Sequence, residues 1–435
     1  MKPSAIKEVK ARQIYDSRAN PTVEVDIILE NGVMGRGIVP SGASTGMFEA
    51  LELRDGGDRF GGKGVDQAVS NVNNILGPAL IGMDVTDQQA IDRKMIAMDG
   101  TPNKQNLGAN AILGSSMAAC WAGANYYGVP LYRYLGGALA NTFPVPMVQI
   151  IGGGAHAAGA IDIQDFLVIP MSAKTFAKGY EMVVHVYNAA KKVFQKAGKP
   201  LSIADEGGFW PTDFKSNEEG LRLLTESIKL AGYEPGVDLG IALDIASSEF
   251  YNKEKGTYVL ALEGRELTRE EFVDMLCRWV EKYPIISIED GSSELDWEGT
   301  RLLTQRLGKR IQLIGDDLFT TNIDRIKKGV EMGAANSVLI KMNQIGSITE
   351  TMEAIEYTQK HGYLPVVSAR SGETEDVTIV HLAIASKAGQ LKVGSAARSE
   401  RTVKWNEVIR VEEALGESAN YPSTGVFTIQ GLSLK

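Results

Sequence analysis

Six short apolar segments in the second half of the chain each lead into a charged residue. In chain order, the segments IALD, IISIED, LIGDD, VLIK, VVSAR and QLK carry Asp244, Glu289, Asp316, Lys341, Arg370 and Lys392. These residues follow one another at intervals of 22 to 45 residues, most of them near the length of one strand–helix unit. If the segments are parallel strands of a barrel, their carboxyl ends meet at one mouth. We therefore expect these charged groups to converge there.

The three acidic residues of this set predict a magnesium site. Asp244, Glu289 and Asp316 supply hard oxygen ligands of the kind that Mg²⁺ accepts while it keeps water and substrate oxygens. Zinc would normally use histidine or cysteine. Acidic residues at strand ends can instead cap helices, but three in register favour a bound cation, because clustered carboxylates otherwise repel one another.

Lysine and carboxyl groups near this site predict proton transfer. Lys341 follows an apolar strand, where burial and the nearby charge of Lys392 would lower its pKa and make it a base. A base beside a divalent cation suits removal of a proton next to a carboxylate, because the cation stabilises the resulting enediolate. Glu206 in ADEGGF and Asp165 in IQDF are candidates for the general acid, although acidic turns are often structural. Gln164 precedes Asp165 in the second of these segments.

Two further segments suit a phosphate group. Arg370 and Ser371 follow a strand, and together they offer a guanidinium fork and a hydroxyl. The hydroxyl-rich loop PSGASTG, residues 40–46, is a candidate lid that would bring Ser44 to a metal or a phosphate. A structural role for Arg370 remains open at this point.

The elements that must position these residues divide the chain in two. Residues 5–40 alternate apolar and polar positions around an Asn-Gly turn, which predicts an antiparallel meander, and small-residue helices follow. We place the boundary near residue 140, which gives an α+β domain at 1–140 and a second domain at 141–435.

The second domain alternates short apolar runs with amphipathic helices, one of which begins at Thr268 with Glu271 in capping-box spacing. This alternation is typical of an α/β protein with parallel strands and crossover helices. The predicted fold class is therefore α/β, with a C-terminal TIM-like (β/α)8 barrel and a smaller N-terminal α+β capping domain.

Composition excludes several other classes of protein. The net charge of -9 provides no basic stripe, so we expect no nucleic acid as a partner. The chain has 2 cysteines, far apart, which favours a reducing cytoplasm over a disulfide framework. The first residues lack the apolar core of a signal peptide, and no apolar run is long enough for a membrane span, so no membrane partner is expected.

Nine segments together resemble motifs of the enolase family, in order and over essentially the whole chain. They are YDSRANPTVEV, VPSGAST, ADEGGF, ALDIASSEFY, SIEDG, GDDLFTTN, IKMNQIG, SGETED and RSER. The resemblance implies an enolase-type barrel, phosphopyruvate hydratase activity and two Mg²⁺ ions, the second bound with substrate. By this resemblance Asp244, Glu289 and Asp316 bind the first ion, and Ser44 joins the substrate phosphate at the second.

The resemblance also assigns roles to the remaining candidates. Lys341 corresponds to the catalytic base, and Glu206 corresponds to the acid that assists loss of hydroxide, with Asp165 beside it. The residues that correspond to substrate contacts are His156, Gln164, Ala369, Arg370, Ser371 and Lys392, of which Lys392 faces the substrate carboxylate. The family is commonly dimeric, and Glu24 and Arg410 match a pair that bridges its subunits, so a homodimer or a larger assembly of dimers is expected.

Two departures from the family lie beside the leaving group. Ala369 stands where the family has histidine, and Asp165 stands where it has glutamate. Both changes remove bulk from this side of the pocket. The residues that are kept support a glycolytic enolase that converts 2-phosphoglycerate to phosphoenolpyruvate.

The departures favour a second activity, a paralogue that acts on a related, bulkier phosphorylated or phosphono acid with a different leaving group. A non-catalytic binding protein of the same fold is a third alternative. Retention of Glu206, Lys341 and Lys392 argues against it.

Overall fold

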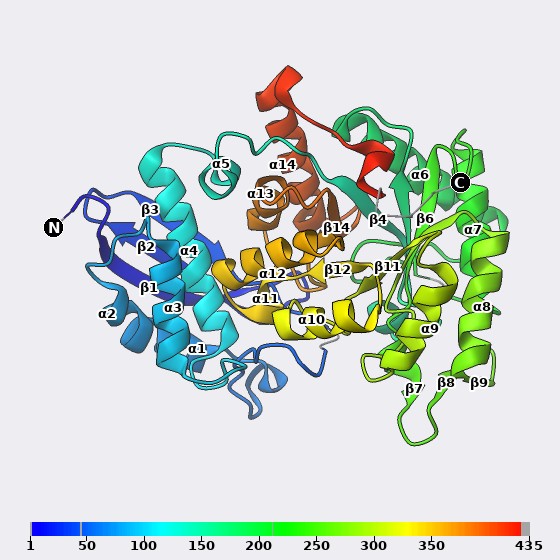
Figure 1. Cartoon of the computed structure of the whole chain (residues 1–435), viewed down its shortest axis with the longest axis horizontal. Helices are drawn as coiled ribbons and strands as arrows, with labels where there is room; N and C mark the ends of the chain where they lie inside the picture. The colour runs from blue at the N-terminus through cyan, green and yellow to red at the C-terminus, as the bar shows by residue number, and fades with distance from the viewer. Residues whose placement is uncertain (1, 44–45, 211, 428–435) are drawn as a thin grey trace.

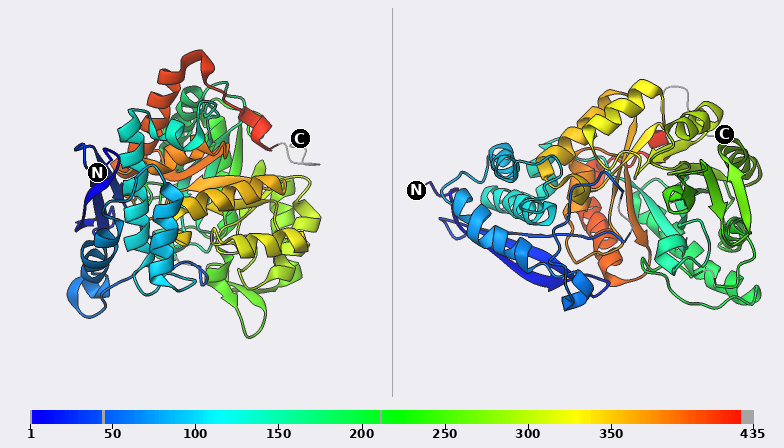
Figure 2. Two further views of the ribbon diagram at one scale, coloured as in Figure 1. Left: turned by 60° about the vertical axis from the view of Figure 1, so that its left-hand side comes forward. Right: turned by 90° about the horizontal axis from the view of Figure 1, so that it is seen from below.

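The N-terminal part of the molecule is a three-stranded antiparallel sheet covered by helices. The computed structural model describes residues 2–43, 46–210 and 212–427. The strands are β1 (Ile6–Tyr15), β2 (Pro21–Leu29) and β3 (Met34–Ile38), in that order across the sheet, so the predicted meander is confirmed. The helices are α1 (Asp66–Asn71), α2 (Gly77–Leu80), α3 (Gln88–Asp99), α4 (Ala109–Tyr127) and α5 (Leu131–Gly136). Figures 1 and 2 show this sheet and its helices beside the barrel.

Close contact between α4 and β3 explains the small residues in both elements. A Cβ atom at Gly35 would lie 2.1 Å from the backbone nitrogen of Ala122, and one at Gly37 would lie 2.7 Å from the carbonyl oxygen of Gly114. Any larger side chain at these glycines would push the helix off the sheet. The run of Ala, Gly and Ser in α4 therefore sets the distance at which the helix packs.

A closed barrel of eight strands forms the rest of the molecule, which confirms the predicted barrel fold. Around the barrel the order is β10-β11-β12-β13-β14-β4-β5-β6. The strands are β4 (Val145–Gly152), β5 (Asp165–Pro170), β6 (Leu239–Asp244), β10 (Ile285–Glu289), β11 (Gln312–Gly315), β12 (Ser337–Ile340), β13 (Leu364–Ser368) and β14 (Gln390–Ser395). Apolar side chains fill the interior, including Met147, Leu167, Ile314 and Leu339, which excludes a pore.

Helices surround the barrel (Figure 1). They are α6 (Phe176–Lys196), α7 (Asn217–Leu230), α8 (Arg269–Lys282), α9 (Trp297–Leu307), α10 (Ile323–Met332), α11 (Met342–Ile345), α12 (Ile348–Lys360), α13 (Thr378–Ala385) and α14 (Ser399–Leu415). A small antiparallel sheet of β7 (Tyr251–Asn252), β8 (Thr257–Leu260) and β9 (Arg265–Thr268) precedes α8. The predicted capping box at the start of α8 is present, since Thr268 and Glu271 each accept a hydrogen bond from the other's backbone N–H.

The expectation of uniformly parallel strands is wrong at β5, which runs antiparallel to both β4 and β6. Residues 153–164 connect β4 to β5 and contain only the 3₁₀ turn Gly154–Ala157, so no helix returns the chain to the opposite end of the barrel. As a result β5 begins, at Asp165, at the mouth where the parallel strands end, and Asp165 pairs in register with Asp244.

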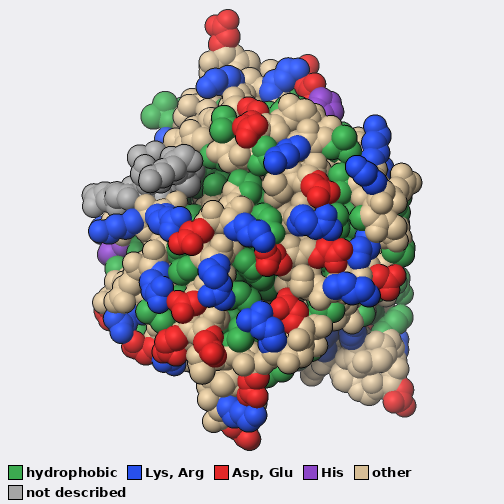
Figure 3. All heavy atoms as spheres, turned by 90° about the vertical axis from the view of Figure 1, so that its right-hand side faces the viewer, with side chains coloured by type: hydrophobic (Ala, Val, Ile, Leu, Met, Phe, Trp, Pro, Cys, Tyr) green, Lys and Arg blue, Asp and Glu red, His purple; other side chains and the backbone are tan. Residues whose placement is uncertain are grey.

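Two surface observations bear on partners. None of the helices in the described part of the chain is both long and apolar enough to cross a membrane. On the face of the barrel that includes α7 and α8, basic and acidic side chains are interspersed (Figure 3).

Candidate active site

The three acidic residues predicted to bind metal lie at the same end of neighbouring strands. Asp244 ends β6, Glu289 ends β10, and Asp316 directly follows β11. Parallel pairing of β6 with β10 sets Asp244 opposite Glu289. All three side chains are buried. The barrel register therefore gathers their charge in a space that water barely reaches.

A lysine ammonium lies between two of these carboxylates. Lys392 Nζ is 2.7 Å from Asp244 Oδ2, and 2.8 and 2.7 Å from Glu289 Oε1 and Oε2. Burial and the neighbouring charge of Asp244 raise the pKa of Glu289 well above its usual range. Although burial opposes ionisation of Asp244 as well, Lys392 lowers the pKa of that carboxyl. A cation at this point offsets much of the repulsion between the two carboxylates.

The strand that contains Lys392 is longer than predicted from the sequence. The apolar run that was expected to end at Lys392 continues as β14 to Ser395, with a shift of register between Lys392 and Gly394. The side chain reaches the carboxylates from within the strand, which allows the residues after it to line the pocket.

The third acidic residue has different partners. Asp316 forms an ion pair with Lys341 and accepts a hydrogen bond from Gln344 Nε2 at 2.8 Å. Asp316, Asp290 and Asp317 each have a carboxylate oxygen within 4.8 Å of the others. Asp290 and Asp317 were not among the ligands predicted from the sequence, although each directly follows a predicted ligand in the doublets Glu289-Asp290 and Asp316-Asp317. The cluster of Asp290, Asp316 and Asp317 offers only oxygen donors, which fits a hard divalent cation such as Mg²⁺.

The pKa of Lys341 departs from the expectation that it would fall. Burial lowers it, but the charges of Asp316 and Glu289 outweigh burial and raise it above its ordinary value. The ion pair with Asp316 therefore keeps the Lys341 ammonium protonated. Lys341 can accept a proton only when it is released from that pair.

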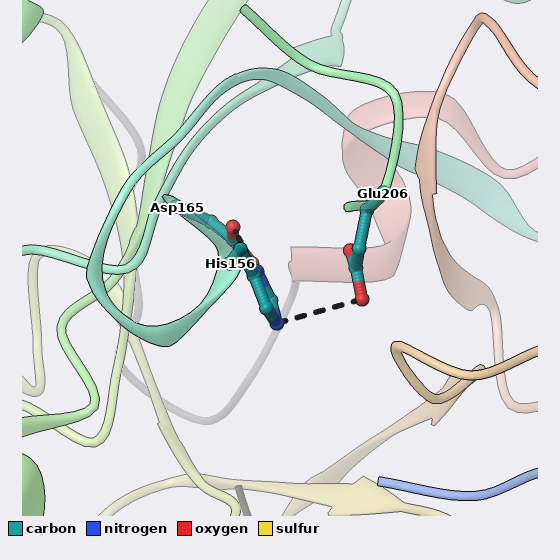
Figure 4. Close-up of side chains that lie close together, drawn as sticks. All are labelled: His156, Asp165 and Glu206. Atoms are coloured by element: carbon teal, nitrogen blue, oxygen red, sulfur yellow. Dashed lines mark hydrogen bonds and ion pairs between the residues drawn. The ribbon is translucent and has the colours of Figure 1, made fainter. Parts of the chain in front are cut away.

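His156, Asp165 and Glu206 come together as a second cluster (Figure 4). His156 Nδ1 is 2.9 Å from Asp165 Oδ1, and His156 Nε2 is 3.7 Å from Glu206 Oε1. Burial alone would lower the pKa of His156, yet Asp165 and Glu206 raise it to about 9. His156 is therefore protonated at neutral pH and lies between Asp165 and Glu206.

Asp165 is itself held firmly. Gln149 Nε2 donates to Asp165 Oδ1 at 2.5 Å, and Lys392 Nζ lies 3.8 Å from Asp165 Oδ2. The adjacent Gln164 donates from Nε2 to Asp244 Oδ2 at 3.2 Å. The start of β5 thus connects the acidic side of the mouth with the histidine side.

The predicted phosphate contacts are tied to the N-terminal part of the molecule. Arg370 Nη1 donates to Glu49 Oε2 and to Asn343 Oδ1, each at 2.9 Å. Ser371 Oγ accepts a hydrogen bond from the backbone nitrogen of Ala43 at 2.7 Å. Ser44, the other predicted contact, lies outside the described residues. Glu49 and Asn343 were missed from the sequence, where nothing marks them as partners of Arg370.

Most of these groups line one small pocket. Its lining includes His156, Gln164, Asp165, Glu206, Asp244, Lys341, Ala369, Arg370, Ser371 and Lys392. A lysine, two acidic side chains and an arginine–serine pair thus face one small polar space. That arrangement suits removal of a proton and loss of a leaving group from a small anionic acid.

Comparison with known proteins agrees with this geometry. Residues 6–135 match the family model for the enolase N-terminal domain, and residues 140–429 match the model for the enolase C-terminal TIM barrel domain. The chain belongs to the enolase family. It is 75% identical to Enolase 1 of Desulfitobacterium hafniense (strain Y51) over 427 residues, which cover 98% of each chain.

Proposed function

We propose that the chain is a magnesium-dependent lyase that converts 2-phosphoglycerate to phosphoenolpyruvate, the phosphopyruvate hydratase reaction. The observation that carries this proposal is that Lys341 and Glu206 line the same pocket as Arg370 and Ser371. The 75% identity to Enolase 1 over almost the full length of both chains supports the same activity.

In the proposed mechanism Asp316 first takes another partner and Lys341 releases its proton to solvent. The neutral Lys341 amine then takes the proton from the carbon next to the substrate carboxylate. The electron pair of that C–H bond forms the new C=C bond, and the bond from the adjacent carbon to its hydroxyl breaks. Glu206 delivers a proton to the departing hydroxide, which leaves as water. His156 and Asp165 hold Glu206 on that side of the substrate.

Other residues bind and orient the substrate. Arg370 and Ser371 would bind the phosphate group, Lys392 would contact the carboxylate, and Gln164 would line the pocket beside it. Asp244, Glu289 and Asp316 would hold Mg²⁺. When bound, Mg²⁺ supplies positive charge that stabilises the doubly charged enediolate. A second ion, bound with substrate and contacted by Ser44, belongs to the proposal by resemblance to the family.

The direct test measures enolpyruvate absorbance in the ultraviolet with 2-phosphoglycerate and Mg²⁺, for the unmodified protein and the Ala369→His variant. We expect turnover at rates ordinary for enzymes, on the order of 1–1,000 per second, by the unmodified protein. Such rates would show that the family's histidine at this position is dispensable. Negligible turnover by a protein that still binds Mg²⁺ would overturn 2-phosphoglycerate as the substrate.

Ala369 and Asp165 favour a second candidate, a related phosphorylated or phosphono acid with a bulkier substituent or a different leaving group. Ala369 lines the pocket, and its methyl group fills less space than a ring would. This candidate predicts that Ala369→His improves turnover of 2-phosphoglycerate over an otherwise poor unmodified protein. A non-catalytic binding protein would require loss of Mg²⁺ binding as well, which the intact acidic set opposes.

The organisation of the molecule is also part of the proposal. A boundary near residue 140, with domains at 1–140 and 141–435, is supported by the separate matches of the two family models. A homodimer, or a larger assembly of dimers, is proposed from the resemblance to the family. Within the chain Glu24 pairs with Arg12, and Arg410 pairs with Glu407.

A cytoplasmic location is proposed for this protein. The described cysteines, Cys120 and Cys277, are both unpaired, as expected in a reducing compartment.

A further inference from the structure

Two cationic side chains are buried on one face of α14, away from the pocket. Arg401 is 0% exposed and Lys404 is 1% exposed, and both rank among the largest fully buried side chains of the described residues. Their spacing of three residues places them on the same side of the helix. Burying two cations beside each other is costly unless each is well hydrogen-bonded.

Arg401 meets this requirement with backbone carbonyls of the active-site segments. Its Nη1 donates to the carbonyl oxygen of Arg370 at 2.6 Å and to that of Val393 at 3.0 Å, and its Nη2 donates to the carbonyl oxygen of Ser371. Val393 directly follows Lys392 in β14. One guanidinium thus joins the backbone after β13 to the backbone of β14.

Lys404 secures the same segment a few residues further on. Its Nζ donates to the carbonyl oxygen of Thr374 at 2.8 Å and lies 3.0 Å from Glu373 Oε2. Glu373 Oε1 in turn accepts a hydrogen bond from the backbone nitrogen of Arg370 at 3.0 Å. Arg370 is therefore held from both sides of its backbone, by Arg401 at the carbonyl and by Glu373 at the nitrogen.

We propose that Arg401 and Lys404 are positioning residues that hold the backbone of Arg370 and Ser371 so that their side chains form a binding site for the substrate's phosphate group. Neither cation lines the pocket, so each acts through the segment 370–374. A side chain held within a fraction of an ångström of its productive position binds an anion without first paying for its own ordering. The inference rests on the proposed function, because it takes the phosphate to be bound at Arg370 and Ser371.

The test compares ligands that have and lack a phosphate. Binding of phosphoenolpyruvate and of tartronate, a hydroxy acid without phosphate, is measured by calorimetry in the presence of Mg²⁺ for the unmodified protein and for Arg401→Lys. The variant keeps the charge but loses the fork. We expect phosphoenolpyruvate binding to weaken about tenfold, as for loss of a charged hydrogen bond, and tartronate binding to change less than about twofold.

Arg398→Lys is the matched control, because Arg398 is exposed immediately before the first residue of α14. This control should leave both affinities unchanged. Equal weakening of both ligands by Arg401→Lys, or no weakening of either, would overturn the proposal.

A double-mutant cycle provides a second readout. If Arg401 acts through Ser371, the effects of Arg401→Lys and Ser371→Ala on phosphoenolpyruvate binding will be less than additive, whereas independent roles give additive effects and contradict the proposal. Lys404→Met tests the same arrangement if Arg401→Lys does not fold, and it should show the same selectivity for the phosphorylated ligand.

Binding is measured apart from turnover. Absence of hydratase activity with selective loss of phosphate binding would therefore contradict the proposed reaction and leave the role of Arg401 intact.

Discussion

At the scale of single residues, the site depends on ion pairs that must change during function. Lys341 and Lys392 are both buried against carboxylates, and both have pKa values raised above the ordinary range of lysine because those carboxylates outweigh burial. A lysine in such a pair is a poor base. The chemistry proposed for Lys341 therefore requires Asp316 to take another partner first.

Removing the base tests this assignment. We expect Lys341→Met to lower kcat by about 10²–10⁴-fold, the usual contribution of a general base, because the other lysine among the described lining residues, Lys392, is held between Asp244 and Glu289. The measurement is enolpyruvate absorbance at saturating Mg²⁺. Lys360→Met, on the exposed end of α12, is the control. Retention of full activity by Lys341→Met would remove Lys341 from the mechanism.

His156 predicts a specific dependence of stability on pH. Its pKa is raised from 6.5 to about 9, so the protonated form is favoured by folding. The resulting stability is fully present below pH 6.5 and is lost as the pH rises through about 9. It amounts to about 3 kcal/mol at roughly 1.4 kcal/mol per pKa unit. The difference in unfolding free energy between the unmodified protein and His156→Gln should shrink between these pH values.

Chemical denaturation from pH 6 to 9.5 measures that difference. His185→Gln serves as the control, because His185 lies on the exposed side of α6, where its ring forms a hydrogen bond with the hydroxyl of Tyr233. A constant difference across this pH range would show that His156 is not held protonated by Asp165 and Glu206.

At the scale of secondary structure, β5 runs opposite to its neighbours, so its first residue, Asp165, lies at the mouth. In the parallel strands it is the last residue that lies there. In a barrel of uniformly parallel strands the start of a strand lies at the far end from the site. Here Asp165 begins β5 opposite Asp244, which ends β6. The short connection after β4 therefore contributes His156, and the start of β5 contributes Asp165, to the same cluster.

The capping box of α8 gives a prediction at the same scale. Thr268→Ala should lower the unfolding free energy by about 1 kcal/mol, because the backbone N–H of Glu271 loses its acceptor. Glu271→Gln should be nearly neutral, since glutamine can make the reciprocal bond to the backbone of Thr268. Thermal unfolding of the three proteins checks both statements. Equal losses from the two substitutions would mean that charge, and not capping, stabilises this end of the helix.

At the scale of the whole molecule, the N-terminal part completes the site of the barrel. Glu49 and Ala43 contact Arg370 and Ser371 across more than 300 residues of sequence. Asp92 on α3 likewise accepts hydrogen bonds from the backbone and hydroxyl of Thr349 on α12. In the proposed function, substrate binding at Arg370 and Ser371 would therefore be coupled to the association of these two parts.

Metal binding should stabilise the molecule as a unit. We expect Mg²⁺ to raise Tm with the logarithm of its concentration above Kd, with about 2.7 kcal/mol of stabilisation at 100 times its Kd. Glu289→Gln should abolish most of this shift, because it removes one of the charges that attract the ion. Glu281→Gln on the exposed side of α8 is the control. An unchanged shift in Glu289→Gln would place the ion elsewhere.

The sequence by itself determined the barrel and the side of the site built from its parallel strands. Asp244, Glu289, Asp316 and Lys341 were identifiable as candidates because each is the last residue of a strand or the first residue after one, and strand ends of a barrel converge. The membership of the family followed from motifs that are short and local.

Only the tertiary structure decided the rest of the site. The direction of β5, the position of Lys392 between two carboxylates and the pairing of Arg370 with Glu49 are contacts between segments remote in sequence. The pKa of Lys341 likewise depends on the balance between burial, which lowers it, and the charge of Asp316, which raises it. That balance follows from the distance between the two side chains, which the sequence does not give. Local patterns carry no information about such distances, because they arise when the chain closes on itself.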